Sequence, residues 1–530
     1  IEALLIILGV IVLIRIGFIM NDDTISQVAM SRGRYTLSSI SSYGTIYDYR
    51  LKTLNNESVK YEAIINPNDD SAIRVLPYVK DKEIYYSGIQ NNLPFLCEIT
   101  SNDVEKDGIT VFKSYIRNHE NQLAPHILGY TSENVGVYGL EKAFDEFLRE
   151  NKELNTARFS IDAVGGVLSG LESSIEYASD INAGIITTLD KDIQKIAETA
   201  MDNSRYNKGA IVVIDIRNGE IRACVSYPDF DIMNIESYLE SNDANFINRA
   251  FSSYSVGSIF KLITAAAALE TGISADFTYT CTGSIDVNGR EFNCHKWGGH
   301  GEINMSTAMV ESCNTYFIAL SEYIDRHKFI EIAESLGFGE GTRLCDGLNS
   351  DDGYIQSPFE ILVPAEKANL SFGQGKLLAT PLQICRMTAC IANNGFINEP
   401  KLILGTMDKD GDIAHFDIED GAKKVLSEKT ISELKRFMIM TANKENSKGL
   451  PTRTGAAGKT STAQTGVFKA DGNEVVNCWF TGYFPVSEPK YAVTVLIEDG
   501  YSGNEAAAPI FREIADNIVM LGLERAKQNK

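Results

Sequence analysis

The sequence has few of the residues that define several classes of protein. Its 530 residues include only nine cysteines and six histidines, and its 49 basic residues are outnumbered by 71 acidic ones. Nine cysteines are too few for a disulfide scaffold, and the odd number leaves at least one thiol without an intramolecular partner. A net charge of −22 repels phosphate backbones, so no nucleic-acid partner is expected.

The chain also lacks internal repeats and low-complexity tracts. Its hydrophobic content of 44% and charged content of 23% are typical of a folded globular chain. This composition excludes a collagen, a coiled coil and a polytopic membrane protein. At roughly 150 residues per domain, the length allows three or four domains, or fewer large ones.

One long apolar segment is present, and it lies at the N-terminus. Residues 3–14 are all apolar, and Arg15 alone interrupts the run to Met20. The chain begins with Ile rather than Met, and no small-residue cleavage site follows, so we expect a truncated signal anchor. Residues 1–20 are therefore predicted to form one membrane helix, with the rest of the chain outside the cytoplasm. The alternative is a helix buried in a core.

The rest of the chain divides into two parts that differ in composition and in hydrophobic pattern. Residues 21–180 are polar, with short β-prone pieces between Asn, Asp and Gly turns, which predicts an extended mixed domain without a dense core. Residues 181–530 mix helical and antiparallel-strand patterns, which predicts one large α/β (α+β) domain. In this part we expect helices over 185–201, 262–269 and 509–521, and strands over 210–214, 221–226, 463–468 and 492–497.

A serine and a lysine three residues apart precede the apolar segment 262–269. Ser258 and Lys261 would share one helix face, within side-chain reach. A lysine in a dry pocket near other cations has a lowered pKa and can take the serine proton, which makes a nucleophile. The helix N-terminus would add partial positive charge where an oxyanion develops. The same spacing recurs from Ser432 and from Ser487 in polar contexts, so this motif alone is weak evidence.

Two further motifs make the pattern specific. Ser312 and Asn314 offer a hydroxyl that can relay a proton and a carboxamide that can hold a substrate amide. Lys459 and Thr460 open a segment that predicts a strand. Such a strand can pair with an extended peptide while its lysine and hydroxyls bind a carboxylate. A phosphate-loop interpretation fails, because Arg453 stands where that motif needs Gly and a strand follows instead of a helix.

The order, spacing and type of these motifs resemble the Ser-x-x-Lys, Ser-x-Asn and Lys-Thr-Gly set of penicillin-binding proteins and serine β-lactamases. Upstream pieces look like the non-catalytic domain of the class B, or monofunctional, penicillin-binding proteins. The resemblance implies a transpeptidase domain with an antiparallel sheet and helices, preceded by a pedestal domain. It covers nearly the whole chain, including residues 44–48, 126–130, 139–141, 248–250, 373–375, 379–383 and 479–483.

This resemblance implies D,D-transpeptidation of peptidoglycan. Ser258 would attack the carbonyl between the terminal D-Ala residues of a stem peptide, with Lys261 as general base, and D-Ala would leave. An amine from a second stem peptide would then resolve the acyl-enzyme. β-Lactams mimic the substrate and would acylate Ser258.

The other motif residues take their implied roles from the same family. Ser312 would shuttle the proton and Asn314 would orient the stem peptide. Lys459 and Thr460 would bind the terminal carboxylate, and the backbone N–H of Thr462 would join that of Ser258 in the oxyanion hole.

The family also implies a location and a partner. The chain would be a single-pass protein of a bacterial cytoplasmic membrane, with its catalytic domain facing the wall. A polytopic membrane glycosyltransferase would contact its anchor and upstream domain. Roles in elongation, division and sporulation remain open alternatives.

Four positions depart from the family pattern. Ser461 stands where Gly is usual, and its side chain is expected to narrow the pocket and weaken acylation. Val256 stands where Pro is usual, and Tyr43 and Tyr49 stand where Arg is common.

Two other functions share these motifs. A serine β-lactamase is one, because residues 366–370 resemble a deacylating loop. The last two residues of that segment are inverted, however, and such an enzyme needs no upstream domain. A non-catalytic scaffold or β-lactam sensor is the other, supported only by Ser461.

Thiols and an imidazole cluster between the first two motifs. Cys281, Cys294, His300 and Cys313 fall within 33 residues, and this donor set suits a closed, structural, tetrahedral Zn²⁺ site. Some class B members of the elongation type carry a comparable zinc site. Cys313 is the middle residue of the Ser-Cys-Asn motif, so the metal would hold that motif in register.

Two alternatives to this ligand set stay open. A disulfide between Cys281 and Cys294 is natural outside the cytoplasm, with Cys313 as a small buried residue. His295 is a rival to His300 as the imidazole ligand.

Overall fold

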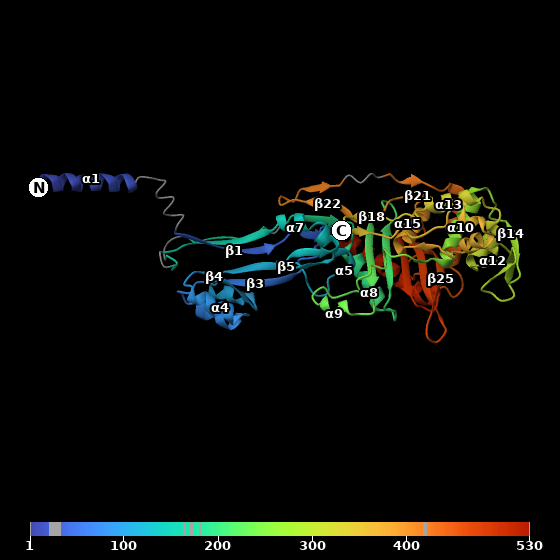
Figure 1. The fold of residues 1–530 in the computed structure, drawn as a ribbon, viewed down its shortest axis with the longest axis horizontal. Helices are drawn as coiled ribbons and strands as arrows, with labels where there is room; N and C mark the ends of the chain where they lie inside the picture. The colour runs from blue at the N-terminus through green and yellow to red at the C-terminus, as the bar shows by residue number, and fades with distance from the viewer. Residues whose placement is uncertain are drawn as a thin grey trace.

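Figure 1 shows an elongated molecule, with a narrow group of N-terminal strands beside a larger body of helices and sheet. The structure is a computed structural model, and it describes residues 2–20, 33–162, 165–168, 173–179, 182–416 and 421–528. The predicted limits between the three domains fall at residues 21 and 180–181, which lie outside the described residues.

The apolar N-terminal segment forms helix α1 (Glu2–Met20). Its large apolar side chains between Ile6 and Phe18 are exposed, so the alternative of a helix buried in a core is wrong. Within the described ranges, no helix has both the length and the apolar character needed to cross a membrane.

Two small sheets precede the body, and we call them the stalk and the lobe. The stalk joins its strands in the order β1–β8–β9, and the lobe joins its strands in the order β4–β3–β5, all antiparallel. The stalk comprises β1 (Arg34–Ser42), β8 (Glu153–Ser160) and β9 (Ser174–Glu176). The lobe comprises β3 (Ser58–Ile65), α3 (Ser71–Val75), η1 (Leu76–Tyr78), α4 (Lys82–Gln90), β4 (Phe95–Ile99), η2 (Asn102–Asp107) and β5 (Val111–Ile116).

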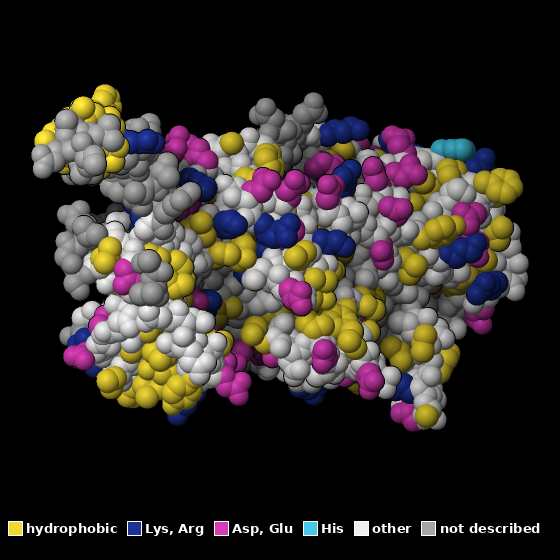
Figure 2. Space-filling view, turned by 60° about the vertical axis from the view of Figure 1, so that its left-hand side comes forward, with side chains coloured by type: hydrophobic (Ala, Val, Ile, Leu, Met, Phe, Trp, Pro, Cys, Tyr) yellow, Lys and Arg dark blue, Asp and Glu magenta, His cyan; other side chains and the backbone are white. Residues whose placement is uncertain are grey.

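The lobe has a core of its own, which corrects the expectation of an upstream domain without one. Ala63, Val75 and Ile99 belong to a cluster of buried apolar residues that joins its sheet to its helices. Figure 2 shows apolar side chains gathered on the outside of the lobe as well, where Ile73 and Ile84 are exposed.

A buried ion pair fixes the region where the lobe meets the body. Arg117 Nη2 lies 2.6 Å from Glu141 Oε2, and both side chains are 1% exposed. Asn55 Nδ2 donates to the other carboxylate oxygen at 2.8 Å. Removing one partner of such a pair leaves an uncompensated buried charge, at a cost of about 3–5 kcal/mol.

The two tyrosines that replace arginine in the opening motif each face an arginine. The guanidinium of Arg117 lies 5.4 Å from the ring centre of Tyr43, and that of Arg222 lies 4.0 Å from Tyr49. Both distances suit cation–π contacts, so aromatic faces here meet the cations of neighbouring elements.

A small mixed sheet ties the N-terminal region to the body. β2 (Thr45–Tyr47) pairs in parallel with β10 (Gly184–Thr187), which pairs antiparallel with β22 (Ile403–Met407), followed by β23 (Ile413–His415). The helix predicted from residue 185 is therefore wrong in its first turn. Pairing with strands from distant parts of the chain makes residues 184–187 a strand, and α8 (Lys191–Asp202) begins after the N-cap Asp190.

The body is built on a five-stranded antiparallel sheet in the order β12–β11–β27–β26–β25. Alternate side chains of its strands point to opposite faces, so Ile211 and Val213 pack into one core while Val212 packs into the other. The strands are β11 (Gly209–Asp215), β12 (Ile221–Tyr227), β25 (Ala457–Phe468), β26 (Glu474–Phe484) and β27 (Tyr491–Glu498).

Helices cover both faces of this sheet. The helices α8 and α18 (Ala508–Gln528) share one core with it. On the other face, α10 (Lys261–Glu270) and α15 (Pro381–Ala392) lie in the larger core. Residues 261–269 are all buried, which confirms the prediction of a helix inside a large domain.

Short elements complete the body and its junction with the stalk. Around the junction lie α5 (Pro125–Leu128), β6 (Tyr130–Ser132), β7 (Val135–Tyr138), α6 (Gly139–Ala143), α7 (Asp145–Glu150) and α9 (Glu236–Leu239). Around the catalytic motifs lie β13 (Tyr254–Ser255), η3 (Gly257–Phe260), β14 (Thr278–Cys281), β15 (Ser284–Val287), β16 (Arg290–Asn293), β17 (Gly301–Asn304), α11 (Met305–Val310) and α12 (Asn314–Ser321). Further along are α13 (Arg326–Ser335), β18 (Arg343–Cys345), β19 (Leu348–Asn349), η4 (Glu360–Leu362), α14 (Pro364–Ser371), β20 (Leu378–Ala379), β21 (Phe396–Ile397), β24 (Lys423–Lys424), α16 (Glu428–Ala442) and α17 (Gly503–Ala506).

Candidate active site

The first motif forms a tight turn that leads into the buried helix. Ser258 lies in the 3-10 turn η3, and Lys261 opens α10. The Nζ of Lys261 lies 2.9 Å from the Oγ of Ser258. Gly257 before them has φ 63, and a Cβ there would come within 2.5 Å of the Ser461 hydroxyl, so only glycine fits this turn.

The second motif meets the first through the same lysine. Lys261 Nζ donates to the backbone carbonyl of Ser312 at 2.7 Å and to Oδ1 of Asn314 at 2.7 Å. Its distance to the Ser312 hydroxyl is 3.1 Å. Ser312 has φ 53, a left-handed conformation that turns the chain between α11 and α12. The structure thus brings together residues that lie more than fifty positions apart in the sequence.

Burial sets the electrostatics of the two lysines. Lys261 is 0% exposed, and desolvation, reinforced by the charge of Lys459, holds the pKa of Lys261 well below its usual range. Lys459 is also buried, and desolvation, with the charge of Lys444, lowers its pKa to about 7. A neutral Lys261 has a free lone pair, so it can accept the Ser258 proton.

The third motif lies on β25, at the edge of the main sheet. Lys459 Nζ donates to the Ser312 hydroxyl at 3.2 Å, which links the third motif to the second. Thr460 is half-buried and Thr462 is exposed, and Thr462 Oγ1 accepts from the backbone N–H of Gly503 at 3.1 Å. An unpaired strand edge beside the nucleophile can add an extended peptide as a further strand.

Ser461 does not project into the cleft as the sequence led us to expect. Its side chain is 3% exposed, and its hydroxyl donates to the backbone carbonyl of Val256 at 2.8 Å. The residue therefore ties β25 to the turn that carries Ser258.

Sequence reasoning missed an ion pair at the rim of the site. Lys444 Nζ lies 2.8 Å from Glu311 Oε2, and Glu311 directly precedes Ser312. The pKa of Glu311 is lowered first by its hydrogen bond with Lys444. The two residues are 133 positions apart, and no local motif marks Lys444, so the sequence offered no signal for it.

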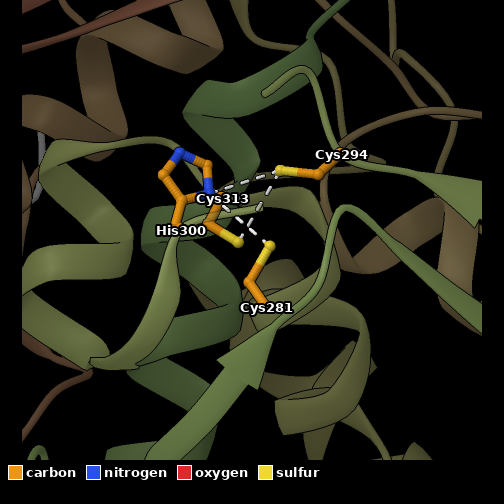
Figure 3. A group of neighbouring side chains, drawn as sticks. All are labelled: Cys281, Cys294, His300 and Cys313. Carbon is orange, nitrogen blue, oxygen red and sulfur yellow. Dashed lines mark hydrogen bonds between the residues drawn. The ribbon is translucent and has the colours of Figure 1, made fainter. Parts of the chain in front are cut away.

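The four predicted metal ligands converge beside the second motif (Figure 3). Cys281, Cys294, His300 and Cys313 offer ligand atoms that all lie within 4.8 Å of one another. Pairing of β14 with β17 places Cys281 opposite Gly301, and hence beside His300. Cys294 follows β16, and Cys313 is the N-cap residue of α12.

Three distances among these atoms fit a tetrahedral zinc ion. Cys294 Sγ lies 3.8 Å from Cys313 Sγ, and His300 Nδ1 lies 3.5 Å from Cys294 Sγ and 3.6 Å from Cys281 Sγ. With Zn–S bonds of about 2.3 Å and Zn–N bonds of about 2.0–2.1 Å, tetrahedral geometry gives S–S edges of about 3.8 Å and S–N edges of about 3.5 Å. The donor set and its spacing therefore suit this metal.

The structure separates the alternatives left open for this cluster. All nine cysteines are free, so the disulfide between Cys281 and Cys294 is not formed. His295 is exposed and approaches only Cys294, at 3.9 Å, whereas His300 approaches two thiols. A hydrogen bond from Cys313 lowers the pKa of the Cys294 thiol, which favours a thiolate within the cluster.

The fold resembles that of solved penicillin-binding proteins. The solved structure of "Penicillin-Binding Protein (PBP2) from Helicobacter pylori" is 22% identical and covers 92% of this chain and 99% of its own, with a TM-score of 0.67. A structure described as "Structural coordination of polymerization and crosslinking by a peptidoglycan synthase complex" is 22% identical and covers 97% of this chain and 96% of its own, with a TM-score of 0.68. The predicted α/β transpeptidase fold, with antiparallel sheet and helices, is confirmed.

Sequence comparison identifies the family to which the chain belongs. Residues 209–516 match the penicillin binding protein transpeptidase domain, and the chain belongs to this family. It is 29% identical to Stage V sporulation protein D of Bacillus subtilis, over 79% of this chain and 66% of that protein. It is 26% identical to Peptidoglycan D,D-transpeptidase MrdA of Haemophilus influenzae, over 85% of this chain and 71% of that protein.

The match to other relatives leaves part of their length uncovered. Penicillin-binding protein PbpB of Mycolicibacterium smegmatis is 28% identical, over 74% of this chain and 63% of that protein. The chain thus spans just under two thirds of the length of this relative and of the B. subtilis protein.

Proposed function

We propose that this chain is a peptidoglycan D,D-transpeptidase that works through an acyl-serine intermediate on Ser258. The observation that carries the proposal is the position of Lys261. Its buried amine lies 2.9 Å from the Ser258 hydroxyl and is held there by the second motif. The names of relatives such as the H. influenzae peptidoglycan D,D-transpeptidase support the substrate.

Acylation would begin with neutral Lys261, which takes the Ser258 proton as Oγ attacks the carbonyl carbon of the penultimate D-Ala. Backbone N–H groups of Ser258 and Thr462 would stabilise the oxyanion. When the C–N bond breaks, Ser312 would give a proton to the departing amine of D-Ala. Ser312 would regain a proton from Lys261, to which it is adjacent.

Deacylation would reverse these proton movements. The amine of a second stem peptide attacks the ester carbonyl and gives its proton to Ser312. Ser312 then passes its own hydroxyl proton to Lys261, the C–O bond to Ser258 breaks, and Lys261 gives that proton to the serine oxygen. A new amide links the two stem peptides, and the enzyme is regenerated.

Substrate binding would use the residues around this centre. Protonated Lys459 and the Thr460 hydroxyl would bind the terminal carboxylate. The carboxamide of Asn314 would orient the stem peptide, which would lie along the edge of β25. β-Lactams would acylate the same serine, and a solved structure described as a ceftriaxone acyl-enzyme complex of penicillin-binding protein A from M. tuberculosis supports this for the family.

We further propose that Cys281, Cys294, His300 and Cys313 hold a structural Zn²⁺. The support is the donor set and its tetrahedral spacing. A bound zinc would supply only rigidity, because a closed site leaves no open position for chemistry. The chain's own residues would do the catalysis, while the site keeps Ser312 and Asn314 on either side of Cys313 in register.

The proposal extends to organisation, location and partner. Residues 1–20 would hold the protein to a bacterial cytoplasmic membrane, residues 21–180 would form the pedestal, and residues 181–530 would face the wall as the transpeptidase domain. A polytopic membrane glycosyltransferase would contact the anchor and the pedestal. The exposed apolar side chains of the lobe support a contact surface there, as does the likeness to a structure described as a peptidoglycan synthase complex.

Labelling with a fluorescent penicillin tests the catalytic proposal. We expect stable, stoichiometric labelling that Ser258→Ala abolishes with little change in thermal unfolding. Ser432→Ala is the matched control, because Ser432 is exposed and begins a Ser-x-x-Lys of the same spacing, and this variant should label fully. Rapid turnover of the label would indicate a β-lactamase instead, and absence of labelling would indicate a non-catalytic scaffold.

A further inference from the structure

The chain has two tryptophans, and they lie in opposite environments. Trp479 is fully buried in the body, whereas Trp297 is 98% exposed. Trp297 lies on the loop of residues 294–300, between β16 and β17. An indole is a large amphipathic surface that is enriched where proteins bind ligands, so its complete exposure on this loop calls for a function.

The 294–300 loop is held rigidly at both ends. Cys294 at its start and His300 at its end both belong to the cluster of metal-ligand candidates. Gly298 and Gly299 between them have φ 80 and 79, and a Cβ on Gly299 would meet a backbone oxygen at 2.1 Å. The backbone on either side of Trp297 is therefore restrained, which reduces the backbone entropy that binding would cost.

The loop borders the second catalytic motif. Asn314 Nδ2 donates to the backbone carbonyl of Asn293, the residue before the loop, at 3.5 Å. Cys294 contacts Cys313, the residue between Ser312 and Asn314. The start of the loop that carries Trp297 therefore contacts the Ser312–Asn314 turn.

The two residues that precede Trp297 in the sequence carry hydrogen-bond donors. His295 and Lys296 precede Trp297 and are exposed. A pyranose ring has a flat face of C–H bonds that matches the electron-rich face of an indole, and its oxygens accept hydrogen bonds from neighbouring donors. The stem peptide already has β25 and Asn314, so the part of the same substrate left to contact the loop is its glycan.

We propose that Trp297 is the stacking platform of a carbohydrate subsite, which binds a sugar ring of the glycan strand that carries the stem peptide. His295 and Lys296 donate hydrogen bonds to the sugar oxygens. The inference rests on the proposed function for the identity of the substrate. Trp297 acts as a positioning residue, because it holds the glycan and does not touch the reacting atoms.

The first experiment measures sugar binding without catalysis. The full chain with Ser258→Ala is titrated with a peptidoglycan disaccharide that has no stem peptide, and quenching of tryptophan fluorescence by iodide is followed. Trp479 is buried, so the quenching reports Trp297. We expect the disaccharide to protect the indole, with half-saturation at about 1 mM. Continued full quenching at saturating disaccharide would overturn the proposal.

The second experiment compares two acyl donors, the free pentapeptide and the same pentapeptide on the disaccharide. Trp297→Ala should lower kcat/KM for the sugar-bearing donor about tenfold more than for the free peptide, chiefly through KM, as loss of a stacking anchor does. Trp297→Phe should recover part of the difference. Tyr323→Ala is the matched control, since Tyr323 is an exposed aromatic just after α12 that belongs to none of the proposed binding surfaces. Equal effects on both donors, or none, would overturn the sugar assignment.

Penicillin labelling of each variant distinguishes a failure of the proposed transpeptidase function from a failure of the carbohydrate subsite. A wild-type chain that neither labels nor turns over would refute the proposed function, while the disaccharide protection would still decide the subsite. A chain that labels normally but shows no disaccharide protection would refute the subsite alone.

Discussion

The Ser461 hydroxyl donates a hydrogen bond to the backbone carbonyl of Val256, 2.8 Å away. These are two of the positions at which the chain departs from the family pattern, and they contact each other. The bond joins β25, which carries Lys459, to the turn that carries Ser258. Ser461 thus joins the strand of the third motif to the turn of the first.

Replacing Ser461 with Gly should preserve acylation and reduce stability. The variant loses one buried hydrogen bond, worth about 1 kcal/mol, and gains backbone freedom in a strand, worth up to about 1 kcal/mol. We expect penicillin labelling at the wild-type rate and a free energy of unfolding lower by about 1–2 kcal/mol, measured by urea titration. Labelling that becomes much faster in the glycine variant would show that Ser461 does obstruct the pocket.

Replacing Lys261 with Ala should slow acylation strongly while the domain stays folded. The change removes the group placed to accept the Ser258 proton, and loss of a general base costs at least about 10²–10⁴ in rate. Stopped-flow acylation by a chromogenic cephalosporin measures the effect. Lys435→Ala is the control, because Lys435 has the same spacing from Ser432 and its amine donates a hydrogen bond to Asn394 instead of to a serine. An acylation rate within tenfold of wild type would refute the role of Lys261.

The two lysines should control the pH dependence of the reaction in two separate ranges, Lys261 on the acidic side and Lys459 on the basic side. Burial lowers the pKa of Lys261 well below its usual range, so it is neutral and active as a base at neutral pH, and acylation declines only as acid protonates it. Burial also lowers the pKa of Lys459 to about 7. Because Lys459 binds a carboxylate only when protonated, KM for stem peptide should rise as pH increases above about 7.

Lys444 provides a test of the pH dependence on the basic side. Its positive charge contributes to the lowered pKa of Lys459, so Lys444→Ala should raise that pKa and move the rise in KM to higher pH. Lys444→Arg keeps the charge and should leave the rise in KM in place. The measurement is the pH profile of KM for a carboxylate-terminated peptide, and an unmoved profile in Lys444→Ala would contradict the assignment.

The three motifs could be recognised in the sequence because each has a short, fixed spacing. Ser258 and Lys261 lie one helical turn apart, so proximity follows from the helix itself. The apolar residues after them predicted a buried helix, and the β-branched residues after Lys459 predicted a strand. The cluster of candidate metal ligands could be predicted from residue type and number.

Other features depended on contacts between distant segments, which no local pattern contains. Residues 184–187 became a strand because β2 and β22 pair with them. Lys444 reached Glu311 through the packing of α16. The direction of the Ser461 side chain depended on which face of β25 met the Ser258 turn. The core of the lobe was missed because its elements are too short to show periodicity.

The last prediction concerns zinc. Protein purified without added metal should carry about one zinc per chain by elemental analysis. Cys313→Ser removes one of four ligands and should lose the metal, lower the unfolding temperature and slow penicillin acylation, because Cys313 lies between Ser312 and Asn314. Cys281→Ser tests the same site from β14, farther along the chain from the motif.

Cys345→Ser is the matched control for this site. Cys345 is a free cysteine outside the group of four, so its replacement should leave zinc content and acylation unchanged. Chelation of wild-type protein should slow acylation of Ser258 and readdition of zinc should restore it, because the metal orders the neighbouring motif without entering the reaction. A metal-free protein with wild-type acylation, or one in which mass spectrometry finds Cys281 crosslinked to Cys294, would eliminate the site.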